Sequence, residues 1–207
     1  MENEFFGGVF YIDLRNYTKL VDDEILKKIA EIIYDYQNLI NFEVNKYFNK
    51  ETISAIEYMG DGIMIIIKNN DVSANISAKS YLHNPFCFKI YEAGKIFRDS
   101  LDNFLQCQKE DYKKYIGLKI LDFGIGLSYS KIFKKIHKRD NRNMFFGSSL
   151  NRAVKIGDSI NKKYNHLAID KKMYDDYLIN ILSESEKRLI IKRDKPLVHM
   201  YQKLYST

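Results

Sequence analysis

The chain opens with an apolar run that ends in an acid. Residues 7–14 read GGVFYIDL, which predicts a buried β-strand with Asp13 at its tip. Beyond this run, apolar residues recur at spacings of three and four and so share one helix face; they are Ile25, Ile29, Ile32, Tyr36 and Leu39. The first part of the chain is therefore expected to fold as a strand followed by an amphipathic helix.

Two further apolar runs, over residues 51–59 and 62–68, meet at the turn Gly60-Asp61-Gly62. An Asp-Gly pair between such runs predicts a β-hairpin, because glycine adopts the positive φ that these turns require. Residues 70–115 show the weakest pattern. A break is expected at Asn84-Pro85, and a long helix is expected after it from apolar residues at helical spacing: Ile90, Ala93, Phe97, Leu101 and Leu105.

The second half of the chain predicts short strands and helices in alternation. Residues 118–129 and 132–138 are expected to form two strands, the second more exposed, followed by a turn at Asp140-Asn141. Ser148 or Ser149 can cap a helix that runs to about Lys163. A strand over residues 166–170, a helix through residue 177 and a closing strand pair over 189–192 and 197–204 complete the pattern. Residues 1–207 thus predict a single α+β domain.

Composition narrows the class of protein. The chain has 207 residues, of which 45% are hydrophobic, enough for a sizeable core. The net charge of +6 is weak support for a nucleic-acid partner, and the basic stretch 131–139 lacks the arrayed aromatic residues of a base-stacking surface. Two cysteines without C-x-x-C spacing, no signal peptide and no run of membrane-spanning length favour a cytoplasmic protein with no membrane segment.

Two acids are the first candidates for chemistry. Asp13 ends the first strand, and Asp61 lies in the turn between the next two. If the first strand lies beside that hairpin, both carboxylates reach the same end of the sheet, where they can hold hard divalent cations that bridge phosphates. The backbone N–H groups of residues 14–18 precede a helix and suit phosphate oxygens. Taken singly, each acid is also an ordinary turn or strand-end residue.

Four segments resemble class III adenylate and guanylate cyclases, in the order of that family. FYIDLRNYT (residues 10–18) is similar to the family's strand–loop–helix start, and EYMGDG (57–62) to its second metal hairpin. GIGL (124–127) resembles its next core strand, and FFGSSLNRAVK (145–155) resembles its aromatic-Gly-x-x-Val-Asn-x-Ala-x-Arg helix. The resemblance implies a ferredoxin-like catalytic domain with a central, mostly antiparallel sheet flanked by helices. It also implies a head-to-tail homodimer with active sites at the interface.

The resemblance assigns roles to particular residues of one subunit. Asp13 and Asp61 would bind two Mn²⁺ or Mg²⁺ ions, with the Leu14 carbonyl as a further ligand. The 3′-hydroxyl of a nucleoside triphosphate would then attack the α-phosphate, and pyrophosphate would leave. Further substrate contacts implied by the family pattern are Tyr17, Thr18, Arg193 and Lys195.

The partner subunit would supply the remaining catalytic groups. Asn151 would orient the ribose, and the residue four positions later would stabilise the transition state. The family usually has Arg at that later position, whereas this chain has Lys155, which keeps the charge but loses the bidentate fork. Arg152 lies nearby and is an alternative, although it does not point along the same helix face.

Three residues bear on base selection. Glu57, four positions before the hairpin acid, favours guanine, whereas Met144, three positions before the glycine of the helix motif, offers no strong donor or acceptor. Tyr58, in its Tyr-x-Gly-Asp hairpin, resembles the pyrimidine cyclases of bacterial anti-phage defence, the Pycsar systems. That resemblance implies a uridylate or cytidylate cyclase, with UTP favoured by family frequency, and a separate effector that senses the cyclic nucleotide.

Other functions stay open at this point. Glu57 supports a guanylate cyclase, or more generally a purine cyclase, and Tyr58 then packs on the sheet as an ordinary strand residue. Lys155 and Met144 support a non-catalytic homologue that binds a nucleotide without turnover. The presence of both metal acids argues against this last reading, because a relaxed site would lose them first.

Overall fold

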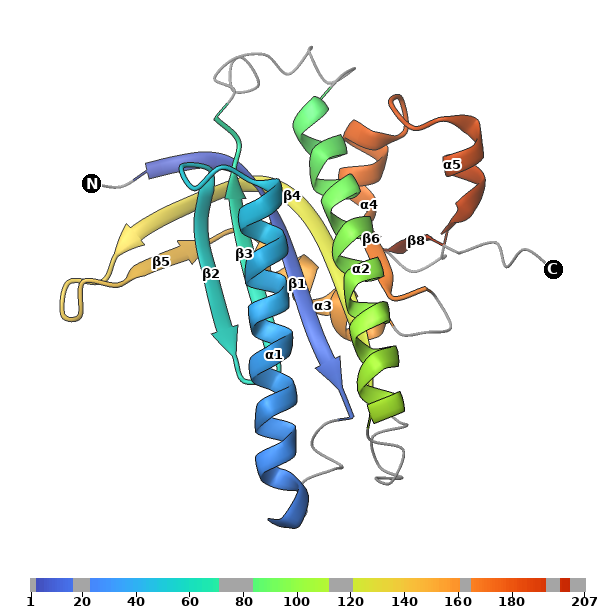
Figure 1. The fold of residues 1–207 in the computed structure, drawn as a ribbon. Helices are drawn as coiled ribbons and strands as arrows, with labels where there is room; N and C mark the ends of the chain where they lie inside the picture. Colours follow the sequence, from blue (N-terminus) through green and yellow to red (C-terminus); the bar gives the residue numbers. More distant parts are fainter. Residues whose placement is uncertain are drawn as a thin grey trace.

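The computed structural model of the chain describes residues 3–16, 23–70, 84–111, 121–160, 165–192 and 198–201. Its strands form one mixed sheet in the order β2-β3-β1-β4-β6-β8-β7, and β5 pairs with the outer part of β4 (Figure 1). The strands are β1 (Asn3–Arg15), β2 (Ile53–Met59), β3 (Gly62–Lys68), β4 (Asp122–Ile136), β5 (Asn143–Phe146), β6 (Leu167–Asp170), β7 (Ile190–Lys192) and β8 (Val198–Tyr201). Neighbouring strands are antiparallel except β4 and β6, which run parallel.

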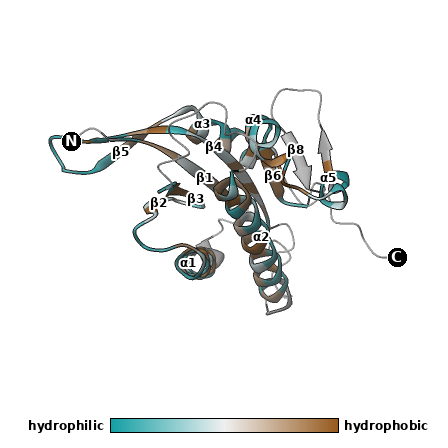
Figure 2. Cartoon of the chain, turned by 90° about the horizontal axis from the view of Figure 1, so that it is seen from above, coloured by the Kyte–Doolittle hydropathy of each residue, from teal (hydrophilic) through white to brown (hydrophobic). Residues whose placement is uncertain are grey.

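Helices cover both faces of the sheet. They are α1 (Asp23–Tyr47), α2 (Pro85–Asp111), α3 (Ser148–Ser159), α4 (Lys171–Met173), the π-helix η5 (Tyr174–Leu178) and α5 (Glu184–Leu189). Seen along the sheet in Figure 2, α1 and α2 lie on one side and α3 lies on the other. Within the described ranges, no helix has the length and apolar character needed to cross a membrane.

The central strands bury both of their faces. In β1, Phe10 and Ile12 belong to the large core under α1 and α2, whereas Val9 belongs to the smaller core that includes Ala153 of α3. Because side chains alternate between faces, a strand covered on both sides must be apolar throughout. This explains why residues 7–14 form a continuous apolar run and not an alternating one.

Several predicted elements are confirmed. The first helix buries the predicted face, with Ile29, Ile32 and Tyr36 at most 4% exposed. The hairpin turns at Gly60, whose φ is +69°, and β7 pairs with β8 as the expected closing pair. The sheet is mostly antiparallel and flanked by helices, as the predicted fold class requires.

Two sequence-based expectations are wrong in detail, and one helix was not expected. Residues 118–129 and 132–138 do not form separate strands, because Ser130 and Lys131 stay paired with β1 inside the single long strand β4. The helix expected to reach Lys163 ends at Ser159, since Ile160 is already extended, and its N-cap is Gly147 without a side-chain cap hydrogen bond, not Ser148 or Ser149. The helix α5 was not expected, although Ser183 and Glu186 form a capping box at its start.

Candidate active site

The β2–β3 hairpin brings the two predicted metal acids to one end of the sheet. Asp13 lies opposite Gly62 in the β1–β3 pairing, and the Leu14 N–H donates to the backbone carbonyl of Asp61 at 3.1 Å. In Figure 1 this is the lower end of the sheet, where β1 finishes and the hairpin turns. The expectation that both acids reach the same sheet end is confirmed.

The environment of the acids is unfavourable for their negative charges. Burial raises the pKa of Asp13 to about 6, and the charges of Asp61 and Asp158 add to this effect. Burial also raises the pKa of Asp61, with Asp158 again contributing. The Tyr11 hydroxyl donates to Asp13 Oδ1 at 3.4 Å and partly offsets the shift. A bound cation would offset the repulsion between these crowded carboxylates and lower their pKa values.

The donor set fits hard divalent ions. Asp13 and Asp61 offer carboxylate oxygens, which Mg²⁺ and Mn²⁺ prefer, and Mg²⁺ is commonly held by one or two carboxylates with substrate phosphates completing the shell. Within the residues that the structure describes, no group of three His, Cys, Asp or Glu side chains forms a closed metal site. An open two-carboxylate site is consistent with ligands supplied by a substrate. The role of the Leu14 carbonyl stays a prediction.

Sequence reasoning missed two charged residues beside the acids. Arg15 places Nε 3.8 Å from Asp13 Oδ2, and its Nη2 donates to the Gly157 carbonyl. Asp158 lies in the last turn of α3, and its charge raises the pKa of both Asp13 and Asp61. Arg15 was detectable from strand periodicity, because residues two apart share a face. Asp158 gives no such local signal, since its position depends on how α3 packs.

The packing of α3 is unusually close because glycines line the contact. A Cβ at Gly126 would lie 2.1 Å from the Ala153 carbonyl oxygen, and one at Gly157 would lie 2.7 Å from the Tyr11 ring. The helix therefore rests directly on the backbone of β1 and β4. Its opposite face is exposed and carries two of the predicted catalytic residues, Asn151 and Lys155.

The two candidate cations of α3 differ in their surroundings. Arg152 donates from Nε to Asp170 Oδ2 at 2.5 Å and from Nη1 to Ser148 Oγ at 2.8 Å. Asp170 is fully buried and also accepts from Ser128 Oγ at 2.8 Å. Lys155 is exposed and has no ion-pair partner within the described ranges. The structure thus favours Lys155 over Arg152 as the cation available to a ligand.

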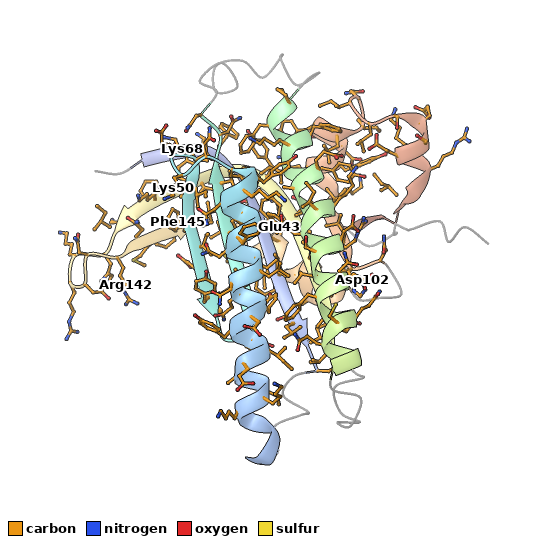
Figure 3. All side chains as sticks on the ribbon, viewed as in Figure 1. Glu43, Lys50, Lys68, Asp102, Arg142 and Phe145 are labelled. Atoms are coloured by element: carbon orange, nitrogen blue, oxygen red, sulfur yellow. The ribbon has the colours of Figure 1, made fainter. Side chains whose placement is uncertain are left out.

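The three residues predicted to select the base line one cavity of about 670 Å³. Glu57 and Tyr58 reach it from β2, and Met144 reaches it from β5. Tyr58 is 48% exposed, and burial of the rest of its ring raises its pKa. The cavity also includes residues that sequence reasoning did not identify, chiefly Arg142, which lies just before β5 (Figure 3). The Arg142 Nε donates to Asp140 Oδ2 at 2.7 Å.

Four predicted substrate contacts belong to stretches of sequence that the structure does not describe. Tyr17 and Thr18 follow β1, and Arg193 and Lys195 precede β8; all four lie outside the described residues. Their assignments stay predictions that rest on the family resemblance.

Comparison with known proteins identifies the fold. Neither the family models nor the curated proteins give a match to the sequence. The structure matches the adenylyl cyclase CyaB from P. aeruginosa with a TM-score of 0.70 and 13% identity, covering 100% of this chain and 99% of that one. The guanylyl cyclase Cya2 gives a TM-score of 0.63 at 14% identity, covering 99% and 96% of the two chains.

A third similar structure contains a nucleotide. The guanylate cyclase domain of RhGC from Catenaria anguillulae, in complex with GTP, gives a TM-score of 0.52 at 14% identity and covers 96% of each chain. At such low identities the similarity shows the fold alone. The chain therefore has the fold of adenylyl and guanylyl cyclase domains, as the sequence resemblance implied.

Proposed function

We propose that this protein is a nucleotide cyclase that converts a pyrimidine nucleoside triphosphate, UTP or CTP, into its 3′,5′-cyclic monophosphate and pyrophosphate. The observation that carries the proposal is the acid pair of Asp13 and Asp61, held at adjacent strand ends within a cyclase fold. The pair offers the oxygen ligands that phosphoryl transfer requires.

The reaction forms one bond and breaks one bond at phosphorus. The ribose 3′-oxygen bonds to the α-phosphorus, the bond to the bridging oxygen of the β-phosphate breaks, and the hydroxyl proton passes to solvent. Divalent ions held by Asp13 and Asp61 would neutralise phosphate charge and lower the pKa of the 3′-hydroxyl. The protein must keep these two carboxylates ionised, and Arg15 helps by lowering the pKa of Asp13.

A second copy of the chain is needed to complete the site. The inner face of α3, which includes Ala153 and Gly157, is buried against the sheet, whereas Asn151 and Lys155 lie on its exposed face. We infer a head-to-tail homodimer in which each chain gives its acids to one site and its α3 to the other. This arrangement supplies the ribose contact and the cation that one chain lacks.

The cavity beside β2 supports a pyrimidine over a purine. Tyr58 lines this cavity, where its ring would fill the volume that the second ring of a purine needs. Its hydroxyl is a donor near neutral pH, and burial raises its pKa further above the ordinary value. Glu57 can accept from N3–H of uracil or from the amino group of cytosine. UTP is proposed ahead of CTP because of its frequency as a substrate in the family that the sequence resembles. The cyclic product would act as a second messenger in anti-phage defence, read by a separate effector.

One observation favours a second candidate, a guanylate cyclase. Glu57 is exposed on the cavity wall, and a carboxylate there can also accept from N1 and N2 of guanine. Met144 does not discriminate between the two, because a thioether is only a weak acceptor.

Product analysis tests the proposal directly. The purified chain is incubated separately with ATP, GTP, CTP and UTP in the presence of Mn²⁺, and products are identified by mass, with Asp61→Ala as the inactive control. Cyclic UMP or cyclic CMP is the expected product. Cyclic GMP would assign the base cavity to Glu57, and the absence of any cyclic product would favour a non-catalytic homologue.

A further inference from the structure

A second cavity, of about 660 Å³, lies far from the acid pair. Phe6 lines it from the start of β1, seven residues before Asp13 on the same strand. At a rise of about 3.3 Å per residue, the two positions are roughly 23 Å apart. The cavity is therefore separate from the proposed active site of the same chain.

The cavity forms where two parallel strands separate. β4 and β6 pair only between residues 125–127 and 167–169. Beyond this point β4 continues into β5 and α3, whereas β6 continues into α4 and η5, so the two segments separate. Crevices at the carboxyl ends of parallel strands, where connections diverge, are the usual ligand sites of α/β sheets. A π-helical turn such as η5 is also frequently found at functional sites.

Aromatic rings form one wall of this cavity. Phe6 stacks on Tyr129 with ring centroids 5.9 Å apart, and Tyr129 meets Tyr177 edge-on at 5.0 Å. The Tyr129 hydroxyl accepts from the side-chain amides of Asn69 at 3.2 Å and Asn84 at 3.4 Å, which fixes its ring. A rigid aromatic wall of this kind suits a planar ring.

Opposite charges line the other walls. Lys172 and Lys131, whose Nζ donates to Glu4 Oε2 at 3.0 Å, reach the cavity together with the hydroxyl of Ser148, the first residue of α3. Asp175 and Asp176 reach it from η5. Lysines and a hydroxyl at a helix start suit a phosphate, while two adjacent carboxylates accept hydrogen bonds from a pair of hydroxyl groups.

We propose that this cavity binds a nucleoside 5′-monophosphate. The base would lie against the ring of Phe6, and the two ribose hydroxyls would donate to Asp176 and to Asp175, which also accepts from Lys171 Nζ. The phosphate would be held by Lys172 and by Lys131, which would exchange its contact with Glu4 for the phosphate. Cyclic monophosphates share this chemistry but present one ribose hydroxyl instead of two, so they bind more weakly. This site requires neither metal ions nor a second chain, and it does not depend on the proposed cyclase activity.

Calorimetric titration tests the site. AMP, GMP, CMP and UMP, and separately their 3′,5′-cyclic forms, are titrated into the full chain in EDTA. At least one 5′-monophosphate is expected to bind, and Lys172→Glu should weaken it by about tenfold or more, as expected for a lost charge-assisted hydrogen bond. Lys50→Glu makes the same charge change in the exposed turn before β2 and should leave the affinity unchanged (Figure 3).

Three outcomes would overturn the proposal. One is the absence of binding by any 5′-monophosphate at millimolar concentration. Another is binding that survives Lys172→Glu but is lost in Tyr58→Ala, which would assign it to the base cavity. The third is tighter binding of the cyclic forms, which contradicts the role given to Asp175 and Asp176. Circular dichroism of each variant separates loss of binding from loss of folding.

Discussion

Removing the negative charge of Asp13 is expected to stabilise the metal-free protein while abolishing turnover. Asp13 has a pKa of about 6 against an ordinary value of 3.8, with burial as the main cause. The difference is about two pKa units, and each unit corresponds to about 1.4 kcal/mol. Because the side chain is 20% exposed, we expect Asp13→Asn to raise the free energy of unfolding by roughly 1–3 kcal/mol at pH 7.5.

The effect must depend on pH in a defined direction. The folded protein binds this proton more tightly than the unfolded chain does, so ionisation of Asp13 lowers stability. The cost is complete above pH 6 and disappears as the pH falls from 6 towards 3.8. The difference between Asp13→Asn and the wild type should therefore be largest at pH 7.5, intermediate at pH 5 and small at pH 4.

Thermal unfolding in EDTA measures this difference. For a chain of this size the expected rise in Tm at pH 7.5 is roughly 3–9 °C. Glu51→Gln removes an exposed charge and should leave the Tm unchanged. Added Mn²⁺ should raise the Tm of the wild type but not that of Asp13→Asn, since only the intact acid pair binds the ion. An unchanged or lower Tm for metal-free Asp13→Asn would refute the assigned electrostatics.

Four further predictions address activity and packing. Turnover at subsaturating Mn²⁺ should fall by about tenfold per pH unit below pH 6, because protons compete with the ion for Asp13; a flat initial-rate profile would contradict this. Asp13→Ala and Lys155→Ala should each be inactive, yet an equal mixture should recover about a quarter of wild-type activity, since half of the dimers carry one intact site. Tyr58→Ala should reduce the preference for pyrimidine over purine triphosphates by about tenfold in kcat/KM, and an unchanged ratio would remove Tyr58 from the base cavity. Gly126→Ala should lower the unfolding free energy in urea by about 1–3 kcal/mol or more, because its Cβ would lie 2.1 Å from the Ala153 carbonyl oxygen.

The parts of the fold with strong local patterns could be predicted from the sequence. Helix α1 has a clear apolar face, and the hairpin at Gly60 carries the turn residues that its backbone requires. The continuity of β4 was missed because Ser130 and Lys131 resemble a break. They are polar where the strand leaves the buried part of the sheet, but β1 still pairs with them there.

The parts of the candidate site that belong to recognisable sequence motifs could be predicted. Asp13 and Asp61 were correctly expected at the same sheet end. The hairpin follows from its turn residues, whereas the position of β1 beside it was a condition of the prediction, which the strand pairing meets. The approach of Asp158 to this pair was not predictable. It depends on a helix packed through glycines onto strands distant in sequence, and no spacing along the chain encodes that contact.

The close packing of α3 also limits how a complete site can form. Gly126 and Gly157 leave no room for a side chain between helix and sheet, and Arg15 donates to the carbonyl of Gly157 beside the acid pair. A helix packed this tightly does not rotate to present its outer face inwards, because interiors resist deformation. Asn151 and Lys155 therefore stay on the exposed face of α3, where they are available to a second copy of the chain. If the chain is a cyclase, the proposed homodimer is the arrangement in which the exposed face of one α3 meets the acids of the other chain.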